Sequence, residues 1–173
     1  MRKLRIEELG RISVDEYKEQ KKQPLIVVLD NVRSMHNVGA VLRTADAFNV
    51  EQVYLCGITP RPPHREIRKT AIGAEESVDW RHAEDAVKLV KKLQKEGYGI
   101  HVLEQAEESK PLPEYKKSPL LPAVLVLGHE IDGVNQAILD IADIALEIPQ
   151  FGTKHSLNVS VAGGIAMYAL TFE

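Results

Sequence analysis

HNVGAVLRTADAFNV, residues 36–50, has the residue spacing of an amphipathic helix. Residues three or four positions apart share one face of a helix, and here one such face is apolar. That face consists of Val38, Val41, Leu42, Ala45 and Phe48. Asn37 stands at the expected N-cap, where its side chain can accept from an early backbone N–H. Arg43 falls on a different side with Gly39 and Asp46, and an arginine beside the buried face needs an explanation.

Apolar runs alternate with helical patterns along the rest of the chain. We expect strands at residues 25–30, 52–57, 76–80, 99–104, 123–128 and 144–149. We expect further helices at residues 83–97, 134–142 and 156–170, a proline-rich connection at 111–122, and an N-terminal helical arm at 1–23. Near-continuous apolar strands alternating with helices predict an α/β fold, with a mostly parallel sheet covered by helices on both faces.

Length and composition favour one main domain, residues 24–173. The 173 residues are 44% hydrophobic and 27% charged, as in ordinary globular proteins, and they suffice for a large core. The single cysteine, Cys56, excludes an intrachain disulfide and favours a reducing compartment, so we expect a cytoplasmic protein. The apolar runs are too short to cross a bilayer, and residues 1–10 lack the apolar stretch of a secretory signal. We therefore expect no membrane association.

The net charge of −3 indicates no particular partner, but the charges are unevenly distributed. Of the 22 lysines and arginines, all but Lys154 precede Pro122. A polyanion would therefore contact the first two thirds of the chain. The cluster RPPHREIRK, residues 61–69, supplies the candidate contacts Arg65 and Arg68, whereas KEQKK, residues 18–22, is typical of a solvated helix face.

Three loops follow expected strands and precede expected helices, at residues 30–37, 127–133 and 148–158. Ligands of parallel α/β sheets bind at the carboxyl ends of the strands, where such loops lie. No G-x-G-x-x-G opens a helix, and Val134 and Asn135 stand where a P-loop needs Lys and Ser or Thr, so ordinary nucleotide sites are unsupported. His36, His129 and His155 fall in separate loops, and we expect no metal site.

Taken together, the three loops resemble the motifs of the SPOUT superfamily of RNA methyltransferases, in its TrmH/SpoU branch of ribose 2′-O-methyltransferases. The three matching segments are HNVGAVLRTADAFNV, VLVLGHEIDGV and EIPQFGTKHSLNVSVAGGIAMYAL, and the resemblance covers residues 24–171 in order. It implies an α/β fold with a C-terminal trefoil knot, an exception to the usual rule against knots. It also implies S-adenosylmethionine (AdoMet) as methyl donor, tRNA or rRNA as substrate, and a homodimer.

The resemblance implies that Arg43 is catalytic. A guanidinium stays protonated in proteins, so Arg43 is better suited to binding the target phosphate and stabilising the forming alkoxide than to acting as a general base. The alternative is an Arg43–Asp46 pair on a solvated helix face. The other residues that match the catalytic motifs are Asn37, Glu130, Ser156 and Asn158. Ser156 could equally be a helix N-cap, whereas Asn158 is expected inside the last helix.

By the same resemblance the cofactor is held by backbone groups of the loops. The implied residues are Leu103, Gly128, His129, Ile148, Gln150 and Leu157. His129 departs from the family pattern, in which Asn or Ser commonly precedes the glutamate. We expect no separate RNA-recognition domain ahead of the motifs, so RNA would be read by the arm, by Arg65 and Arg68, and by the partner subunit.

The final expected helix is crowded with small residues, namely Ser160, Ala162, Gly163, Gly164 and Ala166. Two adjacent glycines cost roughly 1 kcal/mol each in a helix interior, so close approach of another backbone is expected. The approaching element is either the chain's own loop or the same helix of a second subunit, and internal packing alone is a competing explanation. A non-catalytic knotted protein that binds RNA or cofactor remains the alternative to an enzyme.

Overall fold

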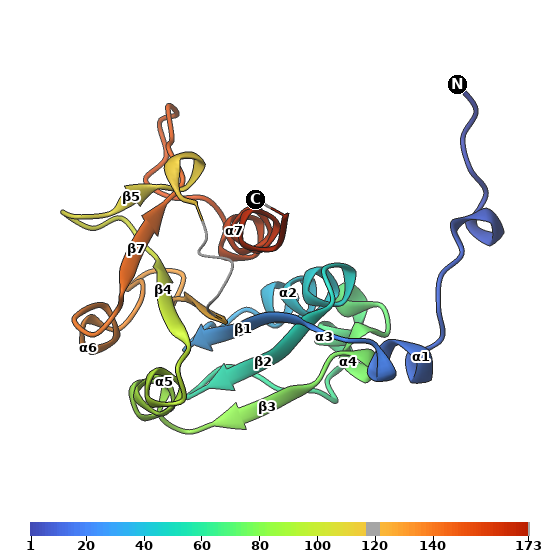
Figure 1. Ribbon diagram of the computed structural model, residues 1–173, viewed down its shortest axis with the longest axis horizontal. Coiled ribbons are helices and arrows are strands. Elements are labelled where there is room, and N and C mark those ends of the chain that lie inside the picture. The colour runs from blue at the N-terminus through green and yellow to red at the C-terminus, as the bar shows by residue number, and fades with distance from the viewer. Residues whose placement is uncertain (117–121, 173) are drawn as a thin grey trace.

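The computed structural model describes residues 1–116 and 122–172 and contains a parallel seven-stranded sheet in the order β3-β2-β1-β6-β4-β7-β5 (Figure 1). The strands are β1 (Gln23–Asp30), β2 (Val50–Cys56), β3 (Trp80–Ala83), β4 (Gly99–Leu103), β5 (Lys110–Pro111), β6 (Ala123–Leu127) and β7 (Ile144–Glu147). The predicted α/β class with a parallel sheet is confirmed.

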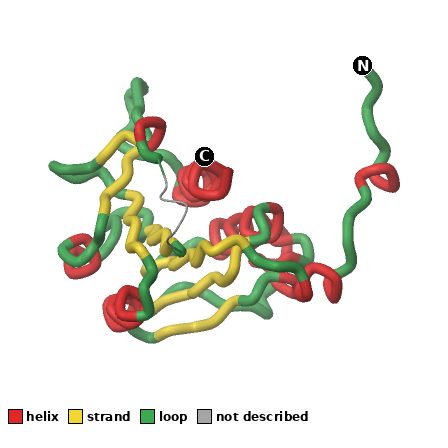
Figure 2. The backbone as a smooth tube through the Cα atoms, in the orientation of Figure 1, coloured by secondary structure: helices red, strands yellow, loops and turns green. Residues whose placement is uncertain are grey.

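The helices are α1 (Val14–Glu19), α2 (Met35–Ala47), α3 (Arg65–Ala71), α4 (Ala74–Ser77), α5 (Ala86–Lys95), α6 (Gln136–Leu139) and α7 (Val159–Phe172). Two 3₁₀ turns, η1 (Ile6–Leu9) and η2 (Leu112–Glu114), complete the list for the described residues. Figure 2 shows the helices on both sides of the strands, as the alternation of the sequence predicts.

Two buried clusters lie on the two faces of the sheet. Leu25, Val27 and Leu29 of β1 pack toward α2 and α7, whereas Ile26 and Val28 pack toward α5 and α6. Successive side chains of a strand point to opposite faces, so a central strand with helices on both sides is apolar throughout. This two-layer core fixes the carboxyl ends of β1, β4, β6 and β7 as neighbours at one edge of the sheet.

The strand expected at residues 76–80 is wrong. Residues Ala74–Ser77 form the short helix α4, and the strand begins only at Trp80. Gly73 is the N-cap of this helix and has a left-handed backbone with φ 91°, and the Glu75 side chain accepts a hydrogen bond from the Gly73 N–H at 3.0 Å. This local bonding outweighs the short apolar pattern. Of the proline-rich connection at 111–122, residues 117–121 lie outside the described part of the chain.

Helix ends also differ from expectation. The N-cap of α2 is Ser34, whose Oγ accepts from the Asn37 N–H at 3.3 Å, so Asn37 is not the cap and lies buried in the first turn. Helix α6 is shorter than predicted and is capped by Asn135. Helix α7 begins at Val159, which leaves the expected Ser156 outside the helix. Because α6 and α7 begin later than predicted, the residues before them belong to loops at the carboxyl edge of the sheet.

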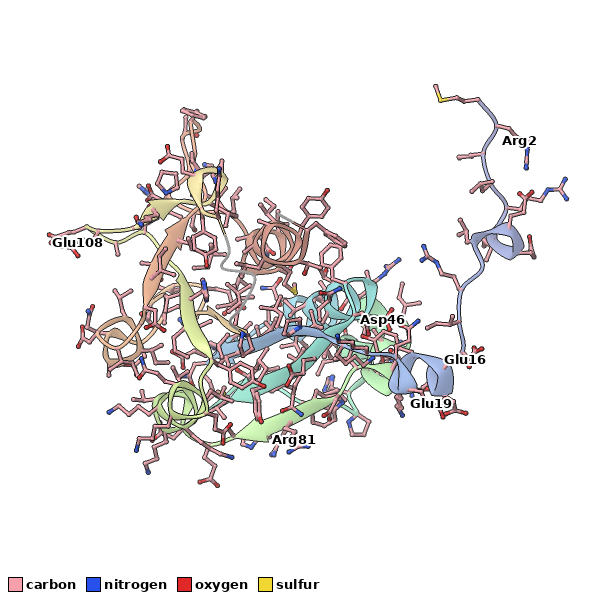
Figure 3. The ribbon with its side chains drawn as sticks, in the orientation of Figure 1. Arg2, Glu16, Glu19, Asp46, Arg81 and Glu108 are labelled. Carbon is pink, nitrogen blue, oxygen red and sulfur yellow. The ribbon has the colours of Figure 1, made fainter. Side chains whose placement is uncertain are left out.

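Residues 1–13 extend away from the sheet, and Figure 3 shows Arg2 at the outer end of this segment, far from Asp46 on α2. The segment is attached through α1, where Tyr17 is buried and its hydroxyl donates to the Ala45 carbonyl at 3.5 Å. The Lys22 ammonium lies 3.3 Å from the centre of the Tyr17 ring. Within residues 1–116 and 122–172, no helix has the length and apolar character needed to cross a membrane.

Candidate active site

A cavity of about 590 Å³ lies beyond the carboxyl ends of β4, β6 and β7. Its walls come from the segment after β4, the loop after β6, and the loop between β7 and α7. All six residues predicted to bind the cofactor line it: Leu103, Gly128, His129, Ile148, Gln150 and Leu157. Three of the predicted catalytic residues, Glu130, Ser156 and Asn158, line it as well. Residues distant in sequence thus meet at one site, as expected for this edge of a parallel sheet.

The loop after β6 folds back on itself. His129 and Gly133 exchange two backbone hydrogen bonds of 3.0 Å each, and Gly133 has a left-handed φ of 71°. The backbone of Gly128 lies so close to Gly133 and Val134 that a Cβ at residue 128 would overlap them. Glycine at position 128 is therefore required by close backbone approach.

Two carboxylates that sequence analysis did not single out anchor this loop. Glu104, directly after β4, accepts from the Val134 N–H at 3.0 Å. Asp30, the last residue of β1, is buried and accepts from the Asn135 N–H at 3.0 Å. The available signal is their position, because each is an acidic residue at the carboxyl end of an apolar strand.

Glu130 joins the first loop to the second. Its carboxylate accepts from the backbone N–H groups of Arg33 and Ser34, each at 3.0 Å, and from the side-chain amide of Asn37 at 3.0 Å. Burial raises the pKa of the Glu130 carboxyl, but these hydrogen bonds outweigh it, and the pKa lies below its ordinary value. Glu130 is therefore held as a carboxylate that accepts hydrogen bonds.

Asn158 joins the third loop to the first. Its side-chain amide donates to the Asn37 Oδ1 at 3.0 Å, while its own Oδ1 accepts from the backbone N–H of Ser160 at 2.9 Å. The Ser160 hydroxyl also donates to the Asn158 Oδ1, at 2.6 Å. Asn158 therefore bonds the first turn of α7 from outside the helix, and its expected position inside the helix is wrong. The chain Glu130–Asn37–Asn158 links all three loops.

His129 lies on the cavity wall with a side chain 12% exposed. Its Nδ1 accepts from the Asp132 N–H at 3.1 Å and lies 3.0 Å from the Asp132 carboxylate. The lining has four carboxylates in all and no lysine or arginine; the four are Glu104, Glu130, Asp132 and Glu147. The cavity is therefore suited to a ligand with positive charge. Within the described residues, no group of three His, Cys, Asp or Glu side chains could hold a metal ion.

Arg43 lies outside the cavity lining, on the exposed side of α2. The alternative of an Arg43–Asp46 pair finds no support, because Asp46 accepts from the Ser77 hydroxyl at 2.5 Å and Arg43 has no ion pair with any residue in the described ranges. The guanidinium is therefore available for a ligand or a second chain.

Arg65 and Arg68 lie on α3, around a second hollow whose wall includes Pro62, His64 and Trp80. This hollow shares no lining residue with the cavity. Arg68 is paired with Glu75 at 3.2 Å and with Glu76 at 3.4 Å, so part of its charge is balanced within the chain. Arg65 is exposed and has no such partner among the described residues.

The sequence is similar to a known protein family and to characterised members of it. The model of the SpoU rRNA Methylase family matches residues 24–168. The tRNA (guanosine(18)-2′-O)-methyltransferase of Aquifex aeolicus is 36% identical over 156 residues, which are 87% of this chain and 70% of that protein. The 23S rRNA (guanosine-2′-O-)-methyltransferase RlmB of Vibrio parahaemolyticus is 32% identical over 161 residues, 93% of this chain but only 64% of that protein.

Solved structures agree with this comparison. The TrmH/SpoU tRNA modifying enzyme of A. aeolicus superposes with a TM-score of 0.80 at 32% identity, covering 91% of this chain and 80% of that one. The AdoMet-bound rRNA methyltransferase of Sinorhizobium meliloti superposes with a TM-score of 0.78 at 26% identity, covering 92% of this chain and 60% of that one. The family model matches most of the chain, residues 24–168, and the chain belongs to the SpoU rRNA Methylase family.

Proposed function

We propose that the protein is an AdoMet-dependent RNA methyltransferase that transfers a methyl group to a ribose 2′-hydroxyl of tRNA or rRNA. The observation that carries the proposal is the hydrogen-bonded chain Glu130–Asn37–Asn158 at the edge of the cavity. It brings together one residue from each of the three motif loops. Family membership supports the reaction class, and the relatives named above act on guanosines of tRNA and of 23S rRNA.

The cavity fits AdoMet in size and charge. Its volume of about 590 Å³ lies within the usual range for small-molecule sites. AdoMet carries a sulfonium, an ammonium and a carboxylate group and is net positive, and the lining offers carboxylates without a lysine or arginine. The backbone of Leu103, Gly128, Ile148 and Leu157 would hold the cofactor. When bound, it supplies an electrophilic methyl group.

The residues of this chain then have separate tasks. Asn37 and Glu130 position the first and second loops, and Asn158 positions the third. These three residues therefore contribute by holding the loops in place, without taking part in the chemical step. Arg43 binds the phosphate of the target nucleotide and stabilises the negative charge that develops on the ribose oxygen. Ser156, exposed on the cavity wall, contacts the substrate or cofactor. Arg65 contributes to RNA binding from α3, and the arm at residues 1–23 adds basic surface to the domain at 24–173.

Two further features belong to the same proposal: a trefoil knot in the C-terminal segment of each chain, and a homodimer.

An exposed apolar stripe on α7 supports the dimer; its members are Val161, Ile165, Tyr168 and Phe172, with exposed fractions of 42–61%. Tyr168 and Phe172 also contact Phe48 beside α2, with ring centres 6.0 Å and 5.7 Å apart. Gly164 of α7 lies beside Thr44, the residue after Arg43, so a second subunit on this face would come close to Arg43. Because its substrate is tRNA or rRNA, we place the enzyme in the cytoplasm.

The two glycines of α7 have different surroundings. A Cβ at Gly163 would lie 2.6 Å from the Leu127 Cδ1 of β6, so internal packing explains this glycine. A Cβ at Gly164 would meet only the Thr44 Cγ2, at 3.8 Å. The space beside Gly164 supports close approach of a second subunit there.

The proposal is tested by methyl transfer. Purified protein is incubated with tritiated AdoMet and unmodified transcripts of tRNA and of 23S rRNA, and the products are digested to nucleosides for mass spectrometry. We expect a 2′-O-methylated nucleoside from one RNA class. The alternative, a knotted protein without catalysis, predicts that AdoMet or RNA binds in calorimetry while no label is transferred to either RNA.

A further inference from the structure

Phe151 has a fully exposed aromatic ring, with an exposed fraction of 100%. It lies in the loop between β7 and α7, which projects away from the sheet after the end of β7 (Figure 1). Residues 151–157 are all exposed. The Gln105 side chain donates a hydrogen bond of 2.8 Å to the His155 carbonyl and so connects this loop to the segment after β4. A single exposed apolar side chain needs no explanation by itself, but the position of this one does.

Phe151 directly follows a residue of the cavity wall. The preceding residue, Gln150, and the later Ser156 both line the cavity wall. Consecutive Cα atoms are about 3.8 Å apart, so the Cα of Phe151 lies that distance from the Cα of Gln150 on the wall. A ribose carries its base on the carbon next to the one that bears the 2′-hydroxyl, so the base of a nucleotide whose 2′-hydroxyl faces the cavity is within a few bonds of the cavity.

We propose that Phe151 stacks on the base of the nucleotide whose ribose is methylated; this rests on the proposed function above. RNA-binding proteins commonly hold unpaired nucleotides by stacking their bases on exposed aromatic rings, which tolerates any base because every base has a π face. A purine such as the guanine of the relatives' substrates offers the larger face. Phe151 then determines how the nucleotide is positioned, without contact to the transferred group.

The surroundings of Phe151 favour RNA over a second protein chain. Gln150, Gly152, Thr153 and Lys154 are the sequence neighbours of Phe151, and Lys154 is the only lysine or arginine after Pro122. Cores of protein interfaces are depleted of lysine, whereas an exposed lysine near a stacked base can contact the phosphate backbone. The α7 stripe, whose exposed members are apolar or aromatic, is the surface with the composition of a subunit contact.

Kinetic comparison of three variants tests the stacking. Phe151→Trp keeps a ring, Phe151→Leu keeps apolar area without a π face, and Phe151→Ala removes both. With the tRNA or rRNA transcript that the wild type methylates, we expect the KM for RNA to rise about fivefold to a hundredfold in the Leu and Ala variants and to stay near wild type in the Trp variant. AdoMet affinity and sedimentation mass stay unchanged. Ile58→Ala, which removes another exposed apolar side chain, is the matched control.

A fluorescence experiment tests the contact without turnover. The probe is a nine-nucleotide single-stranded RNA with a central guanosine, compared with the same strand carrying an abasic site at the centre. We expect guanosine to quench the Phe151→Trp variant more strongly than the abasic strand does, after the signal of Trp80 in the wild type is subtracted.

Four results would overturn the stacking: an unchanged KM in Phe151→Leu, equal quenching by both strands, a lowered sedimentation mass, or a loss of AdoMet affinity. The third would assign Phe151 to a contact between copies and the fourth to the cofactor. Failure of the proposed function looks different, because the wild type itself then transfers no methyl group to either RNA class.

Discussion

The side-chain amide of Asn37 donates a hydrogen bond of 3.0 Å to the carboxylate of Glu130, which lies 93 positions later in the chain. Asn37 is buried in the first turn of α2, and Glu130 follows β6. The same carboxylate accepts from the Arg33 and Ser34 N–H groups, so one side chain satisfies three donors of the first loop. The relative position of two motif loops therefore depends on a single charged group.

Glu130→Gln is expected to lower the free energy of unfolding by about 1 kcal/mol at pH 7, because an amide offers one acceptor oxygen where the carboxylate offers two. The folded-state pKa of Glu130 is lowered, so its stabilisation is complete above the unfolded pKa of about 4.3 and is lost as the pH falls through the folded value. Urea titrations at pH 7 and pH 3.5 measure this. The difference between wild type and variant should shrink at the lower pH.

The matched control is Glu108→Gln, at an exposed carboxylate on the outer edge of the molecule (Figure 3). It should leave the free energy of unfolding unchanged at both pH values. A Glu130→Gln effect no larger than that of the control would show that Glu130 does not hold the loops together.

Arg43→Ala is expected to reduce methyl transfer at least about a hundredfold, because the side chain that stabilises the developing charge is removed. Arg43 is exposed on α2, so AdoMet affinity in calorimetry and the Tm should be nearly unchanged. Arg43→Lys should also fail, since a point charge cannot replace a planar fork that binds phosphate through two parallel bonds. Arg81→Ala on β3 is the control. Loss of folded protein in Arg43→Ala would instead assign the residue a structural role.

Much of the fold follows from the sequence because it depends on local pattern. The continuous apolar strands 25–30 and 123–128 predict buried central strands, and β1 and β6 do lie in the middle of the sheet. The pattern fails where local bonding decides, as at α4, where Glu75 bonds the backbone at Gly73. It gives no strand order, since order depends on which helices and strands pack together.

The site divides in the same way. The loops could be located from their position after strands, and the resemblance supplied the residues that the structure gathers around one cavity. The hydrogen bonds of Asn37 could not be predicted. They depend on Ser34, and not Asn37, being the N-cap of α2, and on β1 and β6 being adjacent strands, which brings Glu130 within reach. The ion pair between Arg68 and Glu75 could not be predicted either. From the sequence, Glu75 is expected to lie just before a strand, whereas it lies on the helix α4.

Arg65→Glu is expected to weaken RNA binding and to lower the slope of log affinity against log salt by about one, because one phosphate contact is lost. Arg68→Gln should have the smaller effect, since Arg68 already pairs with Glu75 and Glu76. Filter binding of the methylated transcript at several salt concentrations measures both. Lys91→Glu, an exposed position on α5, is the control. An Arg65→Glu salt slope equal to that of Lys91→Glu would remove α3 from the RNA contact.

Gly39→Ala is expected to lower the free energy of unfolding by about 1–3 kcal/mol. A Cβ at this position of α2 would overlap the Ile67 carbonyl and the Thr70 hydroxyl of α3, and backbone cannot move aside as a flexible side chain can. Gly164→Ala is the matched helical control, because within the chain a Cβ there would meet only the Thr44 Cγ2 at 3.8 Å. Both variants are measured in the Ile165→Glu background, so that the proposed subunit contact does not contribute. Chemical denaturation should show a loss in the first variant and none in the second. Equal stabilities would mean that α2 and α3 can separate at little cost.

Ile165→Glu is expected to dissociate the proposed homodimer. Ile165 is 42% exposed in the middle of the α7 stripe, so a charge there is solvated in a monomer but would be buried and unpaired in a dimer. The dissociation constant should rise at least about tenfold, since burying such a charge costs more than 1.4 kcal/mol. Sedimentation equilibrium at micromolar concentration measures it, and the wild type should have twice the chain mass of 19.3 kDa.

Two further variants separate dimerisation from folding. Gly164→Leu fills the space beside Thr44 and should also lower the sedimentation mass, or prevent folding if the space is needed within the chain. Val14→Glu changes an apolar residue that is 40% exposed on α1, outside the stripe, and should leave both the mass and the Tm unchanged. If dimerisation completes the site, Ile165→Glu loses methyl transfer in proportion to its monomer fraction while its circular dichroism stays that of the wild type. A wild type that sediments at 19.3 kDa would contradict the dimer and require Arg43 to act within one chain.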